Sequence, residues 1–478
     1  MHIIFLNPQG NFDQNDSFWT EHPDFGGQLV YVKEICIALA KLGVKVDIVT
    51  RRIDDSDWPQ FSKVFDTYTG HEENLRIVRI DCGGPKFLNK EQLWEHLDAF
   101  TDNIISFYGD AFPDFATAHY GDGGYCGVLL KKKAGLDFSF TGHSLGAQKL
   151  GKLGMTLENF DRMNQRYHFS KRIVAENLSM RHASQIITST SQERFEQYAH
   201  PLYQNAVDVD NPSKFSVIPP GVNTRVFNCD KSKADTPIFQ AIEDKLKERK
   251  KPSIILSSRL DVKKNMIGVV KAYALSKQLQ TKANLCIFIR GVDDPYSDIS
   301  GLKSSEQQIL QPILDIIIQN KLRDKVFFLD IRSQKELAAT YRYFAALGSL
   351  FALTAFYEPF GLAPIEAAAC GLAVVATKNG GPSEVFEDGS GILVDPFDEK
   401  EIAEGLLKGI ERYHHYSELG VERVKTKYTW EKTAEAYLEV IQECTQSPQD
   451  NRFFVSELNG TEQIRRYLSE KLRGIHDK

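Results

Sequence analysis

The sequence lacks the cysteine pattern, the apolar segments and the basic leader that mark extracellular and membrane proteins. Its seven cysteines are odd in number, scattered and never spaced C-x-x-C, which excludes a disulfide framework. No run approaches the roughly 18 consecutive apolar residues of a membrane-spanning helix. The N-terminal MHIIFLNPQG has neither a basic leader nor a small-residue cleavage site, so we read it as a strand and not as a signal peptide. We expect a cytoplasmic protein without a membrane partner.

An excess of positive charge is also missing. The 58 Lys and Arg residues face 64 Asp and Glu residues, for a formal net charge of −6, so nucleic acid is not an expected partner. Acidic pairs such as Asp54-Asp55 and Asp293-Asp294 stand in polar stretches, and histidines such as His119 lack the spacing of metal ligands. We therefore expect small-molecule partners and no requirement for a metal or another cofactor.

The length predicts two domains, because one hydrophobic core stops growing beyond about 250–300 residues, and this chain has 478. With 42% hydrophobic and 26% charged residues, the composition is that of a globular protein. A strand-like FSVI runs into Pro-Pro-Gly at 219–221, and a polar, Lys-rich stretch follows before a new strand–helix series. We predict an N-terminal domain over 1–220, a C-terminal domain over 221–429, and a helical segment over 430–478 that packs back on the N-terminal domain.

Strand-like and helix-like patterns alternate in both domains. The segment 28–43 has apolar residues at i, i+3, i+4 and i+7 from Val32, and Gly43 stands where the cap of this helix belongs. The strand-like segments are 2–7, 44–50, 75–80, 115–120, 136–143, 184–190 and 215–221 in the first domain, and 253–259, 284–291, 325–330, 349–354, 373–377 and 391–395 in the second. This alternation predicts the α/β class, with two Rossmann-like, doubly wound parallel sheets facing an interdomain cleft.

Two cations leave one strand of the second domain. Arg259 ends the strand-like segment, and Lys264 follows just before a helix pattern. A guanidinium and an ammonium near one point can neutralise a diphosphate without a metal ion and stabilise a leaving nucleotide. The alternative interpretation is a polar, solvated turn.

Two carboxylates and a helix start follow another strand. Glu358 lies in the loop after 349–354, and Glu366 lies in the early turns of a helix that contains Pro364. Backbone amides at such a helix start bind anions, and here they belong to Gly361, Leu362 and Ala363. Carboxylates accept hydrogen bonds from sugar hydroxyls, so Glu358 suits a hexose and Glu366 a ribose. For Glu366, simple charge complementarity with the helix start is the alternative.

These strings resemble the donor domain of retaining glycosyltransferases of the sucrose synthase and sucrose-phosphate synthase type, in glycosyltransferase family 4. The likeness is carried by SRLDVKKN at 258–265, FYEPFGLAPIEAAACGL at 356–372 and NGGPSEV at 379–385. It implies the two-domain GT-B fold, with Arg259 and Lys264 on the donor diphosphate. It further implies Glu358 at the hexose, Glu366 at the ribose, Ser333 and Gln334 at the base, and Gly27, Gly361, Leu362 and Ala363 elsewhere along the donor.

The first domain carries HPDFGGQLVYVKE at 22–34, HYGDGG at 119–124 and GHSLGAQK at 142–149, each after a predicted strand or at a helix start. With these strings the resemblance to the sucrose-phosphate synthase family extends over nearly the whole chain. It implies transfer of glucose from UDP-glucose to fructose 6-phosphate, with His143 near the transferred glucose as a hydrogen-bonding group. The acceptor residues that it implies are Gly26, Gln28, Lys90, Tyr120, Ser144, Lys149, Lys171 and Arg172, among which Lys90 and Arg172 are implied to bind the phosphate.

One segment departs from the family pattern. Ser170-Lys171-Arg172 stands where relatives often carry a more Arg-rich run, and Lys171 offers a point charge without the fork of an arginine. The resemblance also implies metal-independent transfer with retention, in which the leaving diphosphate acts as the base. No sugar-phosphatase segment is recognisable, so we expect a separate phosphatase to process the phosphorylated product.

Several alternatives stay open. Mannosylfructose-phosphate synthase would use the same architecture with GDP-mannose, and sucrose synthase would use fructose. A sugar-nucleotide sensor would keep the fold without transfer. Gly142-His143-Ser144-Leu145-Gly146 also satisfies the G-x-S-x-G pattern of serine esterases. Esterase chemistry with Ser144 as nucleophile would need a good helix directly after it, which Gly146, Gly151 and Gly154 disfavour.

Overall fold

The computed structural model describes residues 1–19, 22, 24–246, 248, 250–446 and 459–474. The chain forms two compact units: unit 1 comprises Met1–Pro219 with Thr433–Lys478, and unit 2 comprises Pro220–Lys432. The first break lies one residue before the boundary predicted at 220/221. Residues 447–458 and 475–478 of the predicted C-terminal segment lie outside the described residues. The predicted cleft between the domains stays a prediction.

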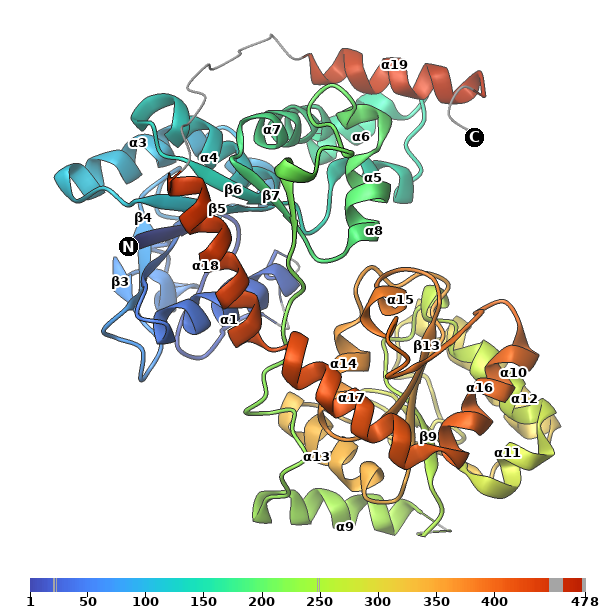
Figure 1. Cartoon of the computed structure of the whole chain (residues 1–478). Helices are drawn as coiled ribbons and strands as arrows, with labels where there is room; N and C mark the ends of the chain where they lie inside the picture. Colours follow the sequence, from blue (N-terminus) through green and yellow to red (C-terminus); the bar gives the residue numbers. More distant parts are fainter. Residues whose placement is uncertain (20–21, 23, 247, 249, 447–458, 475–478) are drawn as a thin grey trace. The chain divides into compact units, whose positions relative to one another are not determined.

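Unit 1 is built on an eight-stranded sheet with the order β3-β4-β2-β1-β5-β6-β7-β8 (Figure 1). All neighbouring pairs are parallel except β3 with β4. The strands are β1 (His2–Leu6), β2 (Lys45–Arg51), β3 (Phe65–Asp66), β4 (Leu75–Ile80), β5 (Phe115–His119), β6 (Phe138–Thr141), β7 (Gln185–Thr188) and β8 (Phe215–Val217). Because the chain moves outward in both directions from β1 and β5, the ends of these two strands form a topological switch point, where such sheets bind ligands.

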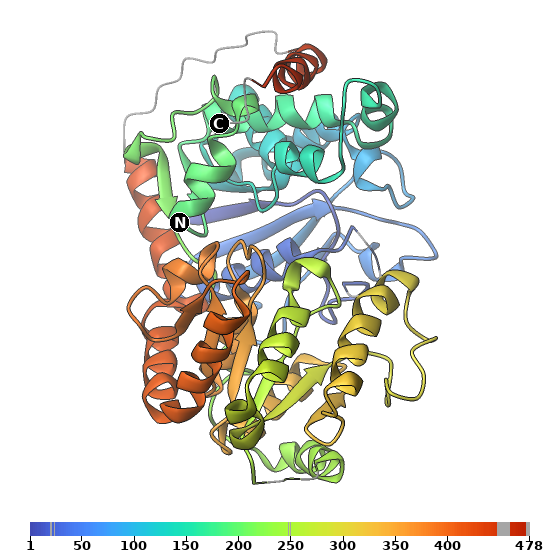
Figure 2. The same ribbon diagram turned by 90° about the vertical axis from the view of Figure 1, so that its right-hand side faces the viewer.

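Helices cover both faces of this sheet (Figures 1 and 2). They are α1 (Gly27–Lys41), α2 (Lys90–Leu93), α3 (Leu97–Tyr108), α4 (Tyr120–Ala134), α5 (Gly146–Lys152), α6 (Phe160–Tyr167), α7 (Phe169–His182) and the short α8 (Ser191–Glu193), followed by the 3₁₀ turn η4 (Pro201–Tyr203). The helix expected over 28–43 is α1, and Gly43 follows its end at φ 80°. Gly43 therefore has the left-handed conformation of a helix cap.

Helix α4 was not expected from the sequence, because its start, Tyr-Gly-Asp-Gly-Gly, disfavours helix formation. The glycines serve close packing instead. A Cβ at Gly123 would lie 2.5 Å from the Leu6 carbonyl oxygen, and one at Gly127 would lie 2.7 Å from the Phe138 ring. The helix can therefore approach the sheet only without side chains at these positions.

Two helices, α18 and α19, lie within the predicted C-terminal segment 430–478. Helix α18 (Trp430–Gln446) starts in unit 2 and continues in unit 1. Its Tyr437 hydroxyl lies 3.0 Å from the Tyr31 hydroxyl and 3.1 Å from Thr141 Oγ1, all within unit 1. Helix α19 (Gly460–Leu472) packs on the core of unit 1 through two buried residues, Ile464 and Leu468.

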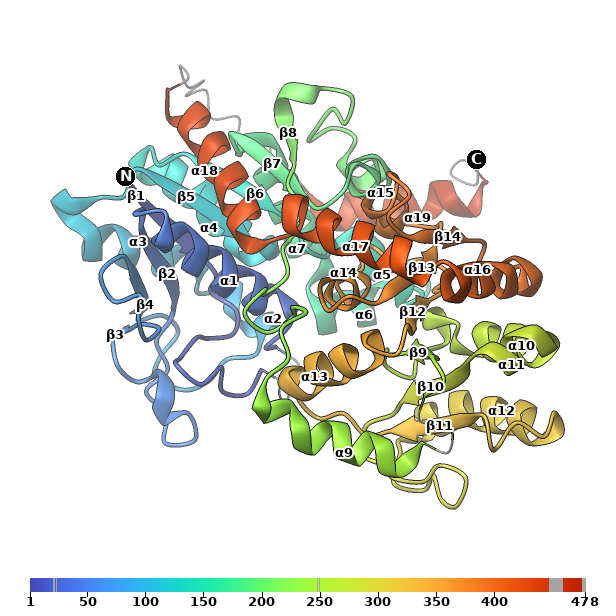
Figure 3. The same ribbon diagram turned by 60° about the horizontal axis from the view of Figure 1, so that its bottom comes forward.

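Unit 2 is built on a six-stranded parallel sheet with the order β11-β10-β9-β12-β13-β14 (Figure 3). The strands are β9 (Ser253–Leu256), β10 (Asn284–Phe288), β11 (Val326–Leu329), β12 (Leu350–Leu353), β13 (Ala373–Thr377) and β14 (Ile392–Val394). This is the doubly wound strand order, with its switch point between β9 and β12. Ligands are expected at the carboxyl ends of these two strands.

The helices of unit 2 are α9 (Thr236–Lys245), α10 (Met266–Leu275), α11 (Lys277–Lys282), α12 (Ser304–Gln319), α13 (Gln334–Ala345), α14 (Leu362–Ala369), α15 (Gly381–Val385), α16 (Glu399–Glu411) and α17 (Tyr413–Lys427). Successive strand residues pack into two separate cores: Ile254 and Leu256 into one, Ile255 into the other. This alternation shows a sheet buried on both faces. The predicted α/β class with two parallel-sheet domains is confirmed. In the described part of the chain, no helix is long and apolar enough to cross a membrane.

Candidate functional site

Two of the donor residues predicted in unit 2, Lys264 and Glu358, meet at the switch point of its sheet. Lys264 follows β9 and Glu358 follows β12, and Lys264 Nζ lies 2.5 Å from Glu358 Oε2. Both side chains are largely shielded from solvent, at 24% and 13% exposed. Residues brought together from sequence positions 94 apart thus form one charged pair at the place where the fold binds ligands.

Backbone hydrogen bonds fix the turn that carries Lys264. The turn is a 3₁₀ segment, Val262–Lys264, capped by Asp261, whose side chain accepts from Lys263 N–H at 2.9 Å. Asn265 follows with φ 50° and donates from Nδ2 to the Thr354 carbonyl at 3.1 Å. Phe356 N–H donates to the Lys263 carbonyl at 2.9 Å. The loops after β9 and β12 are therefore held together independently of the ion pair.

Arg259 differs from Lys264 in having no partner. Its side chain is exposed, and its guanidinium makes no hydrogen bond or ion pair with the described residues. An arginine at a strand end with five unused donors can bind a phosphate in the bidentate manner. The two predicted cations thus differ: Arg259 has no side-chain partner in the described part of the chain, whereas Lys264 is paired with Glu358.

The backbone of the segment NGGP at 379–382 forms hydrogen bonds with the backbone of Glu358. Glu358 N–H donates to the Asn379 carbonyl at 3.2 Å, and Gly381 N–H donates to the Glu358 carbonyl at 2.8 Å. Gly380 between them has φ 96°, and a Cβ there would collide with the Glu358 carbonyl oxygen. The glycine is required both by its left-handed backbone and by this close approach.

The second predicted carboxylate, Glu366, lies on α14. Helix α14 starts after Gly361, whose φ of 95° only a glycine adopts easily. Leu362 and Ala363 form its first turn, so their amides lack partners within the helix. Burial raises the pKa of Glu366 to about 7, and no described residue forms a hydrogen bond or ion pair with its carboxyl group. A poorly hydrated carboxyl group without a partner is suited to hydrogen-bond a ligand hydroxyl.

Ser333 and Gln334 lie at the loop after β11. Ser333 caps α13 by accepting from Glu336 N–H at 3.2 Å, and both predicted residues are exposed. A pocket of about 400 Å³ lies beside them, between α9 and this loop. Its walls include Ile238, Ile242, Asp330, Ile331 and Arg332, rather than Ser333 or Gln334.

In unit 1, two histidines meet at the ends of neighbouring strands β5 and β6. His119 Nδ1 lies 2.9 Å from His143 Nε2, and His119 Nε2 lies 3.1 Å from Thr117 Oγ1. Burial lowers the pKa of His143 to about 4, and it lowers the pKa of His119 well below its usual range. Both imidazoles are therefore neutral near pH 7, which suits His143 to hydrogen bonding.

The backbone and a tyrosine orient His143. Its φ is 54°, a conformation that non-glycine residues adopt rarely. The Tyr31 ring packs edge-on against the imidazole, with ring centroids 4.9 Å apart. His119, on the other side, is stacked on Phe5. The sequence pattern identified His143, whereas His119 and Tyr31 as its supports depend on contacts between distant segments.

Arg172, a predicted phosphate ligand, is engaged with the protein. Its guanidinium donates from Nε to Glu176 Oε1 and from Nη1 to the Tyr120 hydroxyl, both at 2.8 Å, and from Nη2 to the Ser144 carbonyl. Only 4% of Arg172 is exposed. Glu176 is buried as well and accepts from Tyr203 and from Gly146 N–H. This network arranges Tyr120 and Ser144 and occupies three of the five guanidinium donors.

The predicted lysines are more available than Arg172. Lys149 has no carboxylate partner among the described residues; burial lowers its pKa, and the positive charges of Arg172 and Lys90 lower it further. Lys90 Nζ pairs with Asp24 Oδ1 at 2.6 Å. Lys171 lies 3.5 Å from Glu95 in an exposed pair. These positive groups are close enough to influence one another, which favours an anion there.

The remaining predicted acceptor residues lie at helix starts. Gly26 caps α1, Gly27 begins it, and no atom lies within 4 Å of a Cβ built on either glycine. Gln28 Nε2 is buried without a partner. Tyr120 begins α4 with φ 66°. Ser144 Oγ has no hydrogen-bond partner in the described chain, so no base is positioned for the serine esterase alternative, which needs one.

Four supporting residues were missed by the sequence reasoning: Asp24, His119, Asn265 and Asn379. Each holds a predicted residue or its loop through a contact that joins separate segments. Asp24, Asn265 and Asn379 fall within or beside the quoted motifs, so proximity to these motifs was the available signal. Among the described residues, no group of three His, Cys, Asp or Glu side chains is arranged to hold a metal ion.

Comparisons with known families match both parts of the chain. The model described as "Sucrose synthase first GT-B domain" matches residues 1–247, and "Glycosyl transferases group 1" matches residues 238–422. Among solved structures, sucrose-phosphate synthase from Thermosynechococcus elongatus has a TM-score of 0.64 at 23% identity, covering 93% of this chain and 98% of that one. The catalytic domain of starch synthase IV from Arabidopsis thaliana has a TM-score of 0.63 at 15% identity, covering 94% and 100%. These structural likenesses show the fold.

Sequence relatives are more similar. A protein of Thermosipho melanesiensis named probable sucrose-phosphate synthase is 47% identical over 446 residues, which cover 92% of this chain and 96% of that protein. Probable sucrose-phosphate synthase 1 of Craterostigma plantagineum is 31% identical over 539 residues, covering 100% of this chain and 51% of the plant protein. The chain thus spans nearly all of the bacterial relative and about half of the plant one.

Proposed function

The chain belongs to the sucrose-phosphate synthase family of GT-B glycosyltransferases, and we propose that it transfers glucose from UDP-glucose to fructose 6-phosphate, giving sucrose 6-phosphate and UDP. It is a hexosyltransferase. The observation that carries the proposal is the meeting of Lys264 and Glu358 at the switch point of unit 2, where Arg259 also follows β9 and makes no ion pair with any described residue. The loops after β9 and β12 thus carry two cations suited to a diphosphate, Arg259 and Lys264, and one carboxylate suited to a hexose, Glu358.

The donor would lie along the ends of β9 and β12. Arg259 and Lys264 would bind the diphosphate, joined by the amides of Leu362 and Ala363 at the start of α14. Glu358 would accept hydrogen bonds from the glucose hydroxyls, and Glu366 would accept them from the ribose. Because Lys264 already contacts Glu358, donor binding would place one ammonium between the carboxylate proposed for the hexose and the leaving phosphate.

The reaction would proceed with retention and without a metal ion. The acceptor hydroxyl attacks the anomeric carbon from the face that the diphosphate leaves; the carbon–oxygen bond to UDP breaks, and a phosphate oxygen takes the hydroxyl proton. The positive charges of Arg259 and Lys264 stabilise the negative charge that develops on UDP. Neutral His143, supported by His119, would donate or accept a hydrogen bond at the glucose.

The acceptor phosphate would be held mainly by lysines. Lys149 has no carboxylate partner within the described residues, and Lys90 and Lys171 add positive charge. Arg172 would act through Tyr120 and Ser144, whose positions it fixes. This arrangement supports a phosphorylated acceptor over free fructose. We further propose cytoplasmic location, consistent with seven cysteines that form no disulfide within the described residues, and a separate phosphatase for the product.

A panel of substrates tests the proposal. UDP-glucose, ADP-glucose and GDP-mannose are each combined with fructose and with fructose 6-phosphate, in the presence of a chelator, and the product is identified by NMR. We expect UDP-glucose with fructose 6-phosphate to give the highest kcat/KM. A preference for GDP-mannose would support mannosylfructose-phosphate synthesis instead, and a preference for fructose would support sucrose synthase activity.

A further inference from the structure

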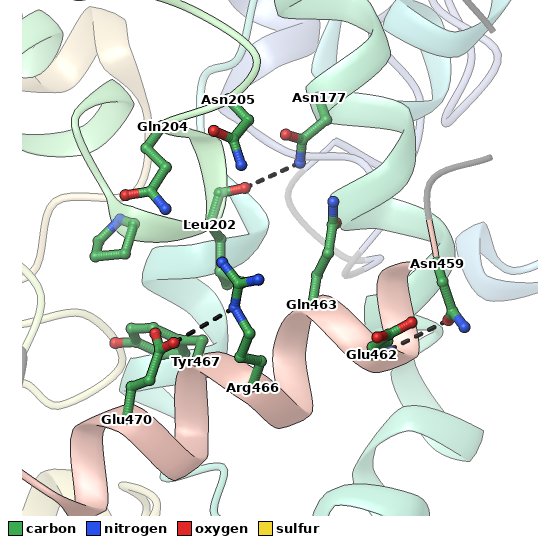
Figure 4. Close-up of a pocket in the computed structure, with 11 residues that line it drawn as sticks. Asn177, Leu202, Gln204, Asn205, Asn459, Glu462, Gln463, Arg466, Tyr467 and Glu470 are labelled. Carbon is green, nitrogen blue, oxygen red and sulfur yellow. Dashed lines mark hydrogen bonds and ion pairs between the residues drawn. The ribbon is translucent and has the colours of Figure 1, made fainter. Parts of the chain in front are cut away.

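We propose that unit 1 contains a second ligand site, separate from the acceptor residues, which binds a neutral sugar beneath the C-terminal helix α19. The site is a cavity of about 230 Å³ between α19, the middle of α7 and the turn η4 (Figure 4). This volume approaches the roughly 300 Å³ lower limit of small-molecule pockets, so it suits one sugar ring. Five of its eleven lining residues are amides: Asn177, Gln204, Asn205, Asn459 and Gln463.

The wall formed by α19 is firmly attached to unit 1. Ile464 and Leu468 are 0% and 4% exposed in the core. The Thr461 hydroxyl lies 3.0 Å from the Ser170 hydroxyl at the start of α7, and Arg465 pairs with Asp161 at 2.6 Å. The cavity is therefore a feature of the folded unit with fixed walls on both sides.

Two amides in the cavity have oxygen atoms without partners. Asn177 is 2% exposed, and its Nδ2 donates to the carbonyls of Ile173 and Leu202 at 2.8 and 3.1 Å, whereas no described residue donates to its Oδ1. Gln463 Oε1 lacks a partner as well, and of the two oxygens it is the one that is itself buried. A buried amide oxygen without a hydrogen bond costs about 1–3 kcal/mol. A ligand with hydroxyl donors would satisfy both atoms.

The chemistry of the lining indicates a sugar. An amide supplies a donor and an acceptor side by side, and a sugar hydroxyl is likewise both. Figure 4 shows Gln204, Asn205 and Asn177 on one side of the cavity and Gln463 rising from α19 on the other. The Tyr467 ring, packed 4.8 Å from the His200 ring, adds a flat apolar surface beside these amides.

The charges of the lining indicate that the sugar is neutral. The charged lining residues are one arginine, Arg466, and two glutamates, Glu462 and Glu470. Arg466 Nε lies 3.3 Å from Glu470 Oε1, so its charge is balanced within α19. A net negative lining disfavours a phosphate, in contrast to the lysines Lys90 and Lys149 of the acceptor group. The two sites would thus distinguish a neutral sugar from a sugar phosphate.

Hydrogen exchange of the full-length chain tests the proposal, with glucose, fructose and sucrose as probes and glucose 6-phosphate and inorganic phosphate as charged controls. A ligand that binds only the closed site, at about ten times its Kd, lowers the open population about tenfold. We expect the amides of 460–472 to exchange about tenfold more slowly with at least one neutral sugar and unchanged with the phosphates. We also expect Lys149→Ala to leave this protection intact.

Variants separate specific binding from general stabilisation. Gln463→Leu keeps the size of the side chain and removes both polar atoms, and Gln204→Ala alters an exposed lining residue in case Gln463→Leu fails to fold. Both should abolish the protection and retain glucosyl transfer. The proposal is overturned if no neutral sugar slows exchange in 460–472, if the phosphates slow it equally, or if the folded variants are protected as strongly as the wild type.

Discussion

Lys264 and Glu358 join the loops after two adjacent strands of unit 2 by an ion pair of 2.5 Å. In a half-buried position, such a pair holds both side chains in place more firmly than an exposed pair does. The pair therefore holds together the carboxylate proposed to bind the hexose and one ammonium proposed to bind the diphosphate. Changing either residue should affect donor binding and catalysis, and not merely stability.

Replacement of Lys264 by alanine is expected to lower kcat/KM for UDP-glucose by about 10²–10³-fold, because a charge that stabilises the leaving diphosphate is lost. Steady-state kinetics measure this effect. Lys263→Ala is the matched control: Lys263 is adjacent and exposed, and its side chain makes no contact with Glu358. If Lys264→Ala and Lys263→Ala had the same kcat/KM for UDP-glucose, Lys264 would not belong to the donor site.

Gly380→Ala tests the close approach of NGGP to Glu358. The added Cβ would meet the Glu358 carbonyl oxygen in a backbone with φ 96°, so we expect a lower Tm and a raised KM for UDP-glucose. Gly389→Ala is the control, because Gly389 has a similar φ of 80° but open space around it. Backbone strain alone costs on the order of 1–3 kcal/mol. The clash at Gly380 is therefore measured by how much further the Tm falls in Gly380→Ala than in Gly389→Ala.

The pH dependence of Glu366→Gln has a definite sign. Burial raises the pKa of Glu366 from 4.5 to about 7, so the folded state binds more protons than the unfolded state between these values. Its contribution to stability is therefore lost as the pH rises from about 4.5 to about 7. Glutamine does not ionise, so the Tm of the variant relative to wild type should be higher at pH 8 than at pH 5.

The same variant should also show a higher KM for UDP-glucose, because glutamine is a weaker acceptor for the ribose hydroxyls. Melting curves at both pH values, together with kinetics, provide the test. A Tm difference that stays constant with pH would contradict the raised pKa. An unchanged KM for UDP-glucose would show that Glu366 does not bind the ribose.

Arg172→Ala and Lys149→Ala should have different effects, although the sequence grouped them. Removing Arg172 leaves the buried Glu176 without its cation, which typically costs about 3–5 kcal/mol, so the Tm should fall. Lys149→Ala should leave the Tm nearly unchanged and raise the KM for fructose 6-phosphate more than that for fructose. Thermal melting and acceptor kinetics measure the two effects. A stable Arg172→Ala protein with only a raised KM would restore Arg172 as a direct phosphate ligand.

The sequence was sufficient for the fold and for the elements on which the proposed donor residues lie. Period-2 and period-3.6 patterns located most strands and helices; Arg259 and Lys264 follow β9, Glu358 follows β12, and Glu366 lies in α14, as expected. Helix α4 was missed because its glycines, which lower helix propensity, serve contact with β1. Such packing depends on tertiary proximity and is not visible in a local pattern.

The sequence also did not show which charged side chains are buried or paired with another residue. Arg172 and Arg259 are the same residue type in the sequence. In the structure, however, Arg172 is buried and paired with Glu176, whereas Arg259 is exposed and has no partner among the described residues. Asp24 reaches Lys90 across 66 positions of the chain. Whether a cation is available to a ligand depends on such long-range partners, which a local sequence pattern does not show.

One measurement tests the central claim most directly. The protein is incubated with UDP-glucose labelled with ¹³C at the anomeric carbon and with fructose 6-phosphate, and the product is followed by NMR. Transfer with retention predicts that the label appears in an α-glucosidic bond to the phosphorylated fructose, with matching release of UDP, and that Lys264→Ala slows this strongly. A β-linked product, or label found only in free glucose, would contradict it.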